Sequence, residues 1–320
     1  MQVDARYDAN VDRREVNHAL RRQGIAFSVL ALAAVITTLF VPRMNAPNEL
    51  LVIGALIVLM GVPHGALDTV FARTQYDLSS WPRWLGFTLT YCGVMASVAL
   101  VWLYSPSLFL IGFLVLSAAH FSGDPTPGTS LLSRIAYGGA VLILPALRFG
   151  PEFEHLIGVL VGPHAAGRVF PFIDAASAPW LCLLVICTVR EFRRSRRTAL
   201  ELTAVGLLVL CVPPLLGFTL FFCGMHSARH IIRTLSLVDP RKRKAVAAAG
   251  VLPMIGVLGL GALLWLLAGA RPVETKLIQL LFVGLAALTV PHMALVEPFR
   301  LRGWQQSAAE QLRRRARNAL

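Results

Sequence analysis

Residues 245–270 read AVAAAGVLPMIGVLGLGALLWLLAGA and contain no Asp, Glu, Lys or Arg. A helix needs about 20 predominantly apolar residues to cross the hydrocarbon core of a bilayer, and this run is longer than that. Residues 24–41 and 84–104 are equally free of charged side chains. The three stretches therefore predict an integral membrane protein built from α-helices.

The composition of the whole chain agrees with this class. Of its 320 residues, 56% are hydrophobic and 15% charged, and the mean hydropathy is +0.65, whereas a soluble domain carries about a quarter charged residues. The net charge of +13 comes from short basic runs between apolar stretches, which is typical of membrane topology signals and not of nucleic-acid binding. The first 23 residues mix acidic and basic side chains, so they do not resemble a cleavable signal, and we expect insertion to begin at the first span.

Seven further stretches are apolar enough to be read as spans, which gives about ten crossings. The ten are residues 24–41, 50–71, 84–104, 107–121, 131–147, 178–192, 199–212, 215–235, 245–270 and 276–299. A single helix over 199–235 would be about 55 Å long, far more than a bilayer requires. Pro213 and Pro214 interrupt that stretch, and we predict that the chain turns back there.

Basic residues test the count of ten, because short cytoplasmic loops are enriched in Lys and Arg. With the turn at Pro213, most of the basic residues fall on one side, including the RKRK run at 241–244. The opposite side receives only Arg43, Arg148, Arg168, Arg271 and Lys276. We therefore expect a multi-pass protein of the cell (inner) membrane with both termini cytoplasmic.

The domain organisation follows from these spans. We predict an all-α polytopic helical bundle in which residues 1–23 form a cytoplasmic tail, 24–300 a single transmembrane catalytic domain and 301–320 a basic cytoplasmic tail. Residues 149–177 contain scattered charged side chains and are predicted to form an outer loop with an interfacial helix.

Five of the eight histidines lie inside apolar helical stretches, where ionisable groups are costly and usually functional. They are His64 in GVPHGALD, His120 in SAAHFSGD, His226 and His230 in GMHSARH, and His292 in TVPHMALVE. All five fall on spans that run inward, at depths of roughly 17 to 24 Å from the outer ends of those spans. Histidines that were merely tolerated would have no reason to share one layer.

His226 and His230 are four residues apart, which places both imidazoles on one helical face. Imidazole suits iron, zinc, copper and nickel, so histidines from several helices at one depth indicate a metal site. For any single histidine, a hydrogen bond to a neighbouring helix is an equally good explanation.

Three carboxylates follow the histidines in the sequence. Asp68 comes four residues after His64, Asp124 four after His120, and Glu297 five after His292. Acids in this position commonly orient a ligating imidazole through its second nitrogen, so the spacing suggests these three pairs. Asp68 and Asp124 have an alternative, in which they end their helices near the interface or pair with Arg73, Arg134 or Arg229.

The motifs PHGALD (63–68), HFSGD (120–124), HSARH (226–230) and PHM (291–293) resemble those of the Brp/Blh family of β-carotene dioxygenases. The resemblance covers roughly residues 50–300. It implies a membrane enzyme that uses non-haem Fe(II) and O2 to split β-carotene, or a related carotenoid, at its central double bond into two all-trans-retinal molecules. A functional link to a rhodopsin would follow from that product.

The resemblance also implies a set of site residues. The iron ligands would be His64, His120, His226 and His230, while Asp68, Asp124, His292 and Glu297 would orient the ligands or line the pocket. Two other classes of protein use the same residue types. One is a histidine-lined membrane transporter of metal ions or protons, and the other is a non-catalytic partner of a retinal protein.

Overall fold

A computed structural model describes residues 11–41 and 46–317, with side chains for 15–41 and 48–298. Parts of the predicted tails (1–10 and 318–320) and the outer-side residue Arg43 lie outside the described residues. The backbone of the described part is almost entirely helical and contains no strand, which confirms the predicted all-α class.

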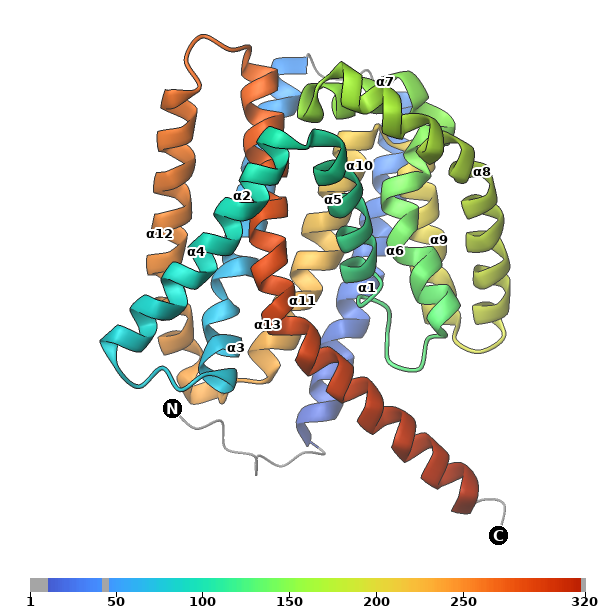
Figure 1. The fold of residues 1–320 in the computed structure, drawn as a ribbon. Coiled ribbons are helices and arrows are strands. Elements are labelled where there is room, and N and C mark those ends of the chain that lie inside the picture. The colour runs from blue at the N-terminus through green and yellow to red at the C-terminus, as the bar shows by residue number, and fades with distance from the viewer. Residues whose placement is uncertain (1–10, 42–45, 318–320) are drawn as a thin grey trace.

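The helices follow one another with short connections (Figure 1). In chain order they are α1 (Val11–Phe40), α2 (Ala46–Ala66), α3 (Asp68–Gln75), α4 (Trp81–Tyr104), α5 (Pro106–Phe121), α6 (Leu131–Ile143), α7 (Pro145–Val161), α8 (Pro163–Phe192), α9 (Arg196–Cys211), α10 (Pro214–Phe221), a π-helical turn η1 (Phe222–Ser227), α11 (Ala228–Ser236), a 3₁₀ turn η2 (Pro240–Lys242), α12 (Arg243–Leu267) and α13 (Val273–Arg317).

All ten predicted spans coincide with helices. Eight helical segments of the described chain are long and apolar enough to cross a membrane. The remaining two predicted spans correspond to α5 and α9, which have 16 residues each. The fold is therefore a helical membrane bundle, while the number of crossings and their sidedness stay predictions.

The predicted turn at Pro213 is confirmed. Helix α9 ends at Cys211 and α10 begins at Pro214, where a proline without an N–H is tolerated because the first turn of a helix does not need that donor. The chain reverses direction there, since Glu201 of α9 forms an ion pair with Arg229 of α11.

The start of α1 and the end of α13 both lie at the lower end of the bundle in Figure 1, as expected for two termini on one side. Helix α1 begins at Val11, inside the predicted tail. The side chain of Gln23 donates a hydrogen bond to the carbonyl of Gly224. The last residue of that predicted tail thus packs against the bundle.

Residues 149–177 differ from the predicted loop, because nearly all of them are helical. Helix α7 lies across the upper end of the bundle in Figure 1, bends at Phe149 and is followed at once by α8. The two helices bury an apolar cluster that includes Ile157, Leu160, Ala166 and Phe170. The scattered charges that suggested a loop lie on the outer faces of these helices, so the prediction overlooked an amphipathic pair.

The helices divide into an inner and an outer group. The five histidines of the apolar stretches lie on α2, α5, η1, α11 and α13, which pack around a common centre. Helices α4 and α12 lie outside this group and are almost free of buried side chains, with none in α4 and only Val246 and Gly250 in α12. Such faces are suited to contact with lipid.

The helix that carries His120 is held close to α6 by a glycine. A Cβ atom added to Gly138 would lie 2.2 Å from the carbonyl oxygen of Ala118 and 2.8 Å from the backbone nitrogen of Ser122. Both atoms belong to the backbone at the end of α5, so they cannot move aside as a side chain would. Any larger residue at 138 would push α5 and α6 apart.

We predict that Gly138→Ala lowers the unfolding temperature of the detergent-purified protein, at a cost of about 1–3 kcal/mol for overpacking. Gly93→Ala is the matched control, because a Cβ at Gly93 meets nothing within 4 Å. The control should be neutral or slightly stabilising, since alanine favours a helix over glycine. Equal unfolding temperatures for the two variants would contradict the close approach of α5 and α6.

Candidate metal centre

The five membrane histidines lie together in the structure. The ring centroids of His120, His226, His230 and His292 are 6.4, 5.0, 4.2 and 4.8 Å from that of His64. Four of the five side chains are buried, with exposed fractions of 3–6%, and His230 is partly buried. The predicted shared layer is thus observed as a single cluster, while the other three histidines lie elsewhere on the chain.

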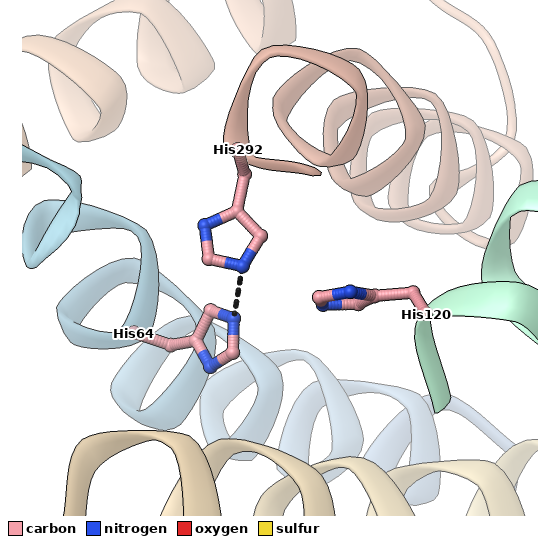
Figure 2. A group of neighbouring side chains, drawn as sticks. All are labelled: His64, His120 and His292. Carbon is pink, nitrogen blue, oxygen red and sulfur yellow. Dashed lines mark hydrogen bonds between the residues drawn. The ribbon is translucent and has the colours of Figure 1, made fainter. Parts of the chain in front are cut away.

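His64, His120 and His292 form the tightest group, with one possible ligand atom from each within 4.8 Å of the others. Figure 2 shows the three rings converging from α2, α5 and α13. The Nε2 atoms of His64 and His292 are 3.3 Å apart. His292, which the sequence prediction placed outside the ligand set, is therefore as central as any of the four predicted ligands.

His226 and His230 approach His64 from another side. Both rings pack against the imidazole of His64, as expected for residues on one helical face. His226 belongs to the π-helical turn η1 and His230 to α11. A π-turn inserts one extra residue into a helix and occurs frequently at functional sites. Here the extra residue rotates α11 relative to α10 and so determines the side of the helix on which the two imidazoles lie.

Each of the three predicted carboxylates contacts a histidine, but not the one that the spacing suggested. Asp68 Oδ1 lies 2.5 Å from His292 Nδ1. Asp124 Oδ2 lies 3.0 Å from His226 Nδ1, and Glu297 Oε1 lies 3.4 Å from His120 Nδ1. The suggested pairs His64–Asp68, His120–Asp124 and His292–Glu297 are wrong.

Helix geometry explains the exchange of partners. Helix α2 ends at Ala66 and α5 at Phe121, so Asp68 and Asp124 lie beyond the helices whose histidines precede them. Glu297 is five residues from His292, which turns it about 140° away on the surface of α13. Each acid therefore reaches a histidine on a helix other than the one whose histidine precedes it.

Tyr91 extends one of these contacts and was missed from the sequence. Its hydroxyl donates a hydrogen bond of 2.8 Å to Asp68 Oδ2, so Asp68 bridges Tyr91 of α4 and His292 of α13. Tyr91 lies in an apolar helix without any local motif, and no sequence signal distinguishes it from a tyrosine at the membrane interface.

Arginines fix the loop that carries Asp124. The carbonyl oxygen of Asp124 accepts hydrogen bonds from Arg229 (3.0 Å) and Arg233 (2.7 Å), while Arg134 donates to the carbonyls of Ser122, Thr126 and Thr129. These arginines bond to main-chain carbonyls of the loop, and the carboxylate of Asp124 is turned toward His226. The carboxylate of Asp124 pairs with His226, and the guanidinium of Arg229 pairs with Glu201.

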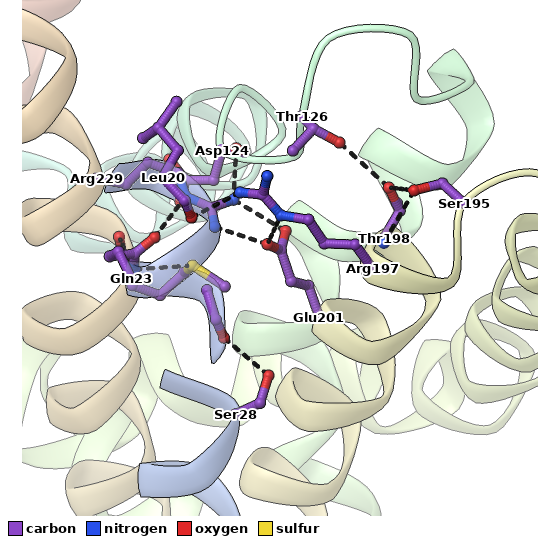
Figure 3. A network of polar contacts seen from close by, with 12 residues as sticks. Leu20, Gln23, Ser28, Asp124, Thr126, Ser195, Arg197, Thr198, Glu201 and Arg229 are labelled. Carbon is purple, nitrogen blue, oxygen red and sulfur yellow. Dashed lines mark hydrogen bonds and ion pairs between the residues drawn. The ribbon is translucent and has the colours of Figure 1, made fainter. Parts of the chain in front are cut away.

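Arg229 is itself held in a buried network (Figure 3). Its guanidinium is fully buried and forms two hydrogen bonds with Glu201, of 2.8 and 2.9 Å. A third bond of 2.9 Å joins it to the side-chain oxygen of Gln23. A signal for Glu201 is present in the sequence, because an acid inside an apolar helix needs a partner, but its partner Arg229 lies on another helix.

The charge state of Asp124 suits a hydrogen-bond acceptor. Burial works to raise the pKa of its carboxyl, but His226, Arg233 and Arg229 outweigh that effect and lower the pKa below its ordinary value. The group is therefore ionised at neutral pH and accepts a hydrogen bond from His226 Nδ1. A neutral imidazole that carries its proton on Nδ1 presents a lone pair on Nε2.

The residues present fit a metal ion. Two nitrogens that lie about 2.1 Å from one ion in a tetrahedral arrangement are about 3.4 Å apart, close to the 3.3 Å between His64 Nε2 and His292 Nε2. His64 Nδ1, the other nitrogen of this ring, is buried and has no hydrogen-bond partner, so an ion held at Nε2 would leave this atom unpaired. The contacts between carboxylates and Nδ1 atoms repeat the arrangement typical of histidine metal sites.

An apolar cavity of about 380 Å³ adjoins the histidines. Its lining includes His64, His120, His226 and His292 at one end, and apolar side chains of α2, α5, α10, α12 and α13 elsewhere. Leu258, Leu260 and Leu264 of α12 line the cavity and are each 45–46% exposed. The cavity therefore reaches the lipid-facing surface beside α12.

A helical membrane bundle with a buried histidine cluster beside an apolar cavity defines a class of membrane protein that acts on an apolar molecule. Comparison with known proteins gives the family. Residues 55–300 match the family model described as β-carotene 15,15'-dioxygenase. The chain belongs to this family of enzymes, which confirms the resemblance of its motifs.

Two curated relatives bear corresponding names. A protein of uncultured marine bacterium 66A03, named β-carotene 15,15'-dioxygenase, is 30% identical over 76% of this chain and 91% of its own length. A protein of Halobacterium salinarum, named probable β-carotene 15,15'-dioxygenase Blh, is 25% identical over 90% of this chain and 94% of its own length. No solved structure matches the chain.

We predict that Asp124→Asn lowers the affinity of the cluster for metal by about 10–100-fold, because loss of a carboxylate partner weakens a ligating imidazole by that amount. Metal content of the purified protein after dialysis against graded chelator measures the effect. Asp174→Asn is the control, since Asp174 is exposed on α8 and far along the chain from the cluster. Equal metal retention by both variants would show that Asp124 does not support a metal-binding histidine.

Proposed function

We propose that this protein cleaves β-carotene, or a related carotenoid, at its central double bond with O2 to give two all-trans-retinal molecules. The observation that carries the proposal is the contact between the buried histidine cluster and the apolar cavity. Membership of the β-carotene 15,15'-dioxygenase family supports the same reaction.

Fe(II) is the metal that we propose for the cluster. His64, His120, His226 and His230 are the ligands that the motifs favour, and the 3.3 Å contact of His292 with His64 adds a fifth candidate. Bound iron would supply the means to activate O2, since histidine ligands leave it open positions. A reaction that inserts both oxygen atoms needs no further cofactor.

Side chains around the cluster would orient the imidazole rings and keep water out of the cavity. Asp124 accepts the Nδ1 proton of His226, and Asp68 and Glu297 lie against His292 and His120 in the same way. Each contact fixes the rotation of a ring and directs its proton away from the other histidines. The apolar walls of the cavity would exclude water and hold a hydrocarbon chain against the cluster.

The alternative of a metal or proton transporter is less well supported. A transported ion needs polar groups along its path. Among the residues that the structure describes, the polar side chains that line this cavity besides the histidines are Ser117, Thr289 and the indole of Trp265, so the path that adjoins the cluster suits a hydrocarbon. Retinal as the product would also account for a functional link to a rhodopsin.

Expression in a bacterial host that accumulates β-carotene tests the reaction. We expect the wild-type protein to bleach the cells and to produce retinal, measured by chromatography of extracts. The double variant His226→Ala with His230→Ala should lower retinal by at least about 100-fold, because loss of a single outer partner already costs about 10–100-fold. His155→Ala is the control, since His155 is exposed and contacts Glu274 outside the cluster. Equal retinal from the double variant would contradict the metal assignment.

Removal of the metal tests iron separately. We expect chelation of the purified protein to abolish cleavage, and Fe(II) to restore it where Zn(II) does not, because zinc has no redox chemistry with O2. Iron content should fall in the variants His64→Ala, His120→Ala, His226→Ala and His230→Ala. Loss of iron from His292→Ala would make His292 a ligand, and full retention would make it a pocket residue. Restoration by Zn(II) would rule out iron as the working metal.

A further inference from the structure

Two cavities meet at a wall of aromatic side chains. The cavity beside the histidines has a volume of about 380 Å³, and a second of about 70 Å³ is lined by α5, α6, α7, α10 and α13. Phe113 and Phe218 are the two residues that line both cavities. Their rings therefore separate the larger space from the smaller one.

The wall lies at a defined distance from the histidines. Phe113 precedes His120 by seven residues on α5, which is two helical turns or about 10 Å along the same face. Phe218 precedes His226 by eight residues, on the helix that faces α5 across the cavity. Phe113 and Phe218 thus line the cavity about two helical turns from the histidine cluster, on the side of α5 and α10.

The wall is braced from behind. The ring of Phe282 packs against Phe113 and Phe218, with centroid distances of 6.3 and 5.2 Å. Phe113 also stacks on Phe109 at 6.2 Å, and Phe218 on Phe222 at 5.8 Å. Rings in contact on several sides have few other rotamers available, so the side chains of Phe113 and Phe218 are held in fixed positions.

A hydrocarbon substrate makes such a stop necessary. A carotene has no polar group, so no hydrogen bond can determine which of its many similar double bonds lies at the histidines. The conjugated chain is stiff and extended, however, and a blocked end fixes the position of every bond along it. Steric contact with the walls of the cavity is the remaining means of alignment.

We propose that Phe113 and Phe218 form the stop that selects the double bond to be cleaved, by holding one end group of the carotenoid at a fixed distance from the histidine cluster. This inference rests on the proposed carotenoid cleavage. It assigns to the two phenylalanines a role in positioning the substrate, with no part in holding metal.

Replacing either ring would join the two cavities and let the substrate slide deeper. In the β-carotene-accumulating host, Phe113→Ala, Phe218→Ala and the double variant should produce pairs of aldehydes of unequal length, one longer and one shorter than retinal. We expect the ratio of off-centre to central products to rise by at least about tenfold, the smallest discrimination that a hydrophobic pocket gives for one methylene. Mass spectrometry of the extracted aldehydes measures the ratio.

Phe170→Ala is the matched control, because Phe170 is a buried phenylalanine that lines neither cavity. It should lower stability and leave the product ratio unchanged. If the alanine variants do not accumulate, Phe113→Leu and Phe218→Leu keep most of the volume and decide the question by the same ratio, with a smaller rise expected.

If the wall variants produce retinal with the same ratio of off-centre to central products as the wild type, the stop is overturned and the proposed reaction is left intact. A wild-type protein that yields no aldehyde from β-carotene would instead overturn the proposed reaction. A product shift of equal size in Phe170→Ala would also overturn the stop, because general loosening of the bundle would then explain it.

Discussion

The guanidinium of Arg229 joins four segments that are distant in the sequence. It bonds to Glu201 of α9, to Gln23 of α1 and to the main chain at Asp124, while belonging itself to the helix of His226 and His230. A charge at this depth has no access to water, so its partners must come from the protein, and removal of Glu201 would leave the buried guanidinium without its carboxylate. The same bonds hold the loop in which Asp124 faces His226, and the geometry of the histidine cluster depends on them.

The polar and apolar parts of the site have separate tasks. Carboxylates contact three of the five histidines, and each of these contacts joins two segments that are distant in the sequence. The cavity next to them is apolar and ends in packed aromatic rings. The cluster can therefore supply reactivity without recognising the substrate, while the shape of the cavity recognises a substrate that offers no polar group.

Much of this arrangement could be predicted from the sequence, because the bilayer restricts helices to a few lengths and directions. The ten helical stretches, the turn at Pro213 and the common depth of the histidines all follow from hydropathy, proline positions and the rise per residue. The carboxylate partners could not be predicted, since they depend on how each helix is rotated about its axis. Asp68 was matched to His64 by spacing and contacts His292 instead. Residues 149–177 were predicted as an outer loop with an interfacial helix and are nearly all helical, because the charged faces of α7 and of the first half of α8 resemble a loop.

The leucines of α12 that line the cavity are also exposed on the outer surface of the bundle, the face suited to contact with lipid. An enzyme with such an opening samples its substrate from a two-dimensional solution. Its degree of saturation is then governed by the mole fraction of carotenoid among the lipids, and adding carotenoid-free membrane at constant volume dilutes the substrate. Binding and Michaelis constants for this protein are therefore best expressed as the mole fraction of substrate among the lipids. The composition of the host membrane is then one of the variables that set the rate of the enzyme.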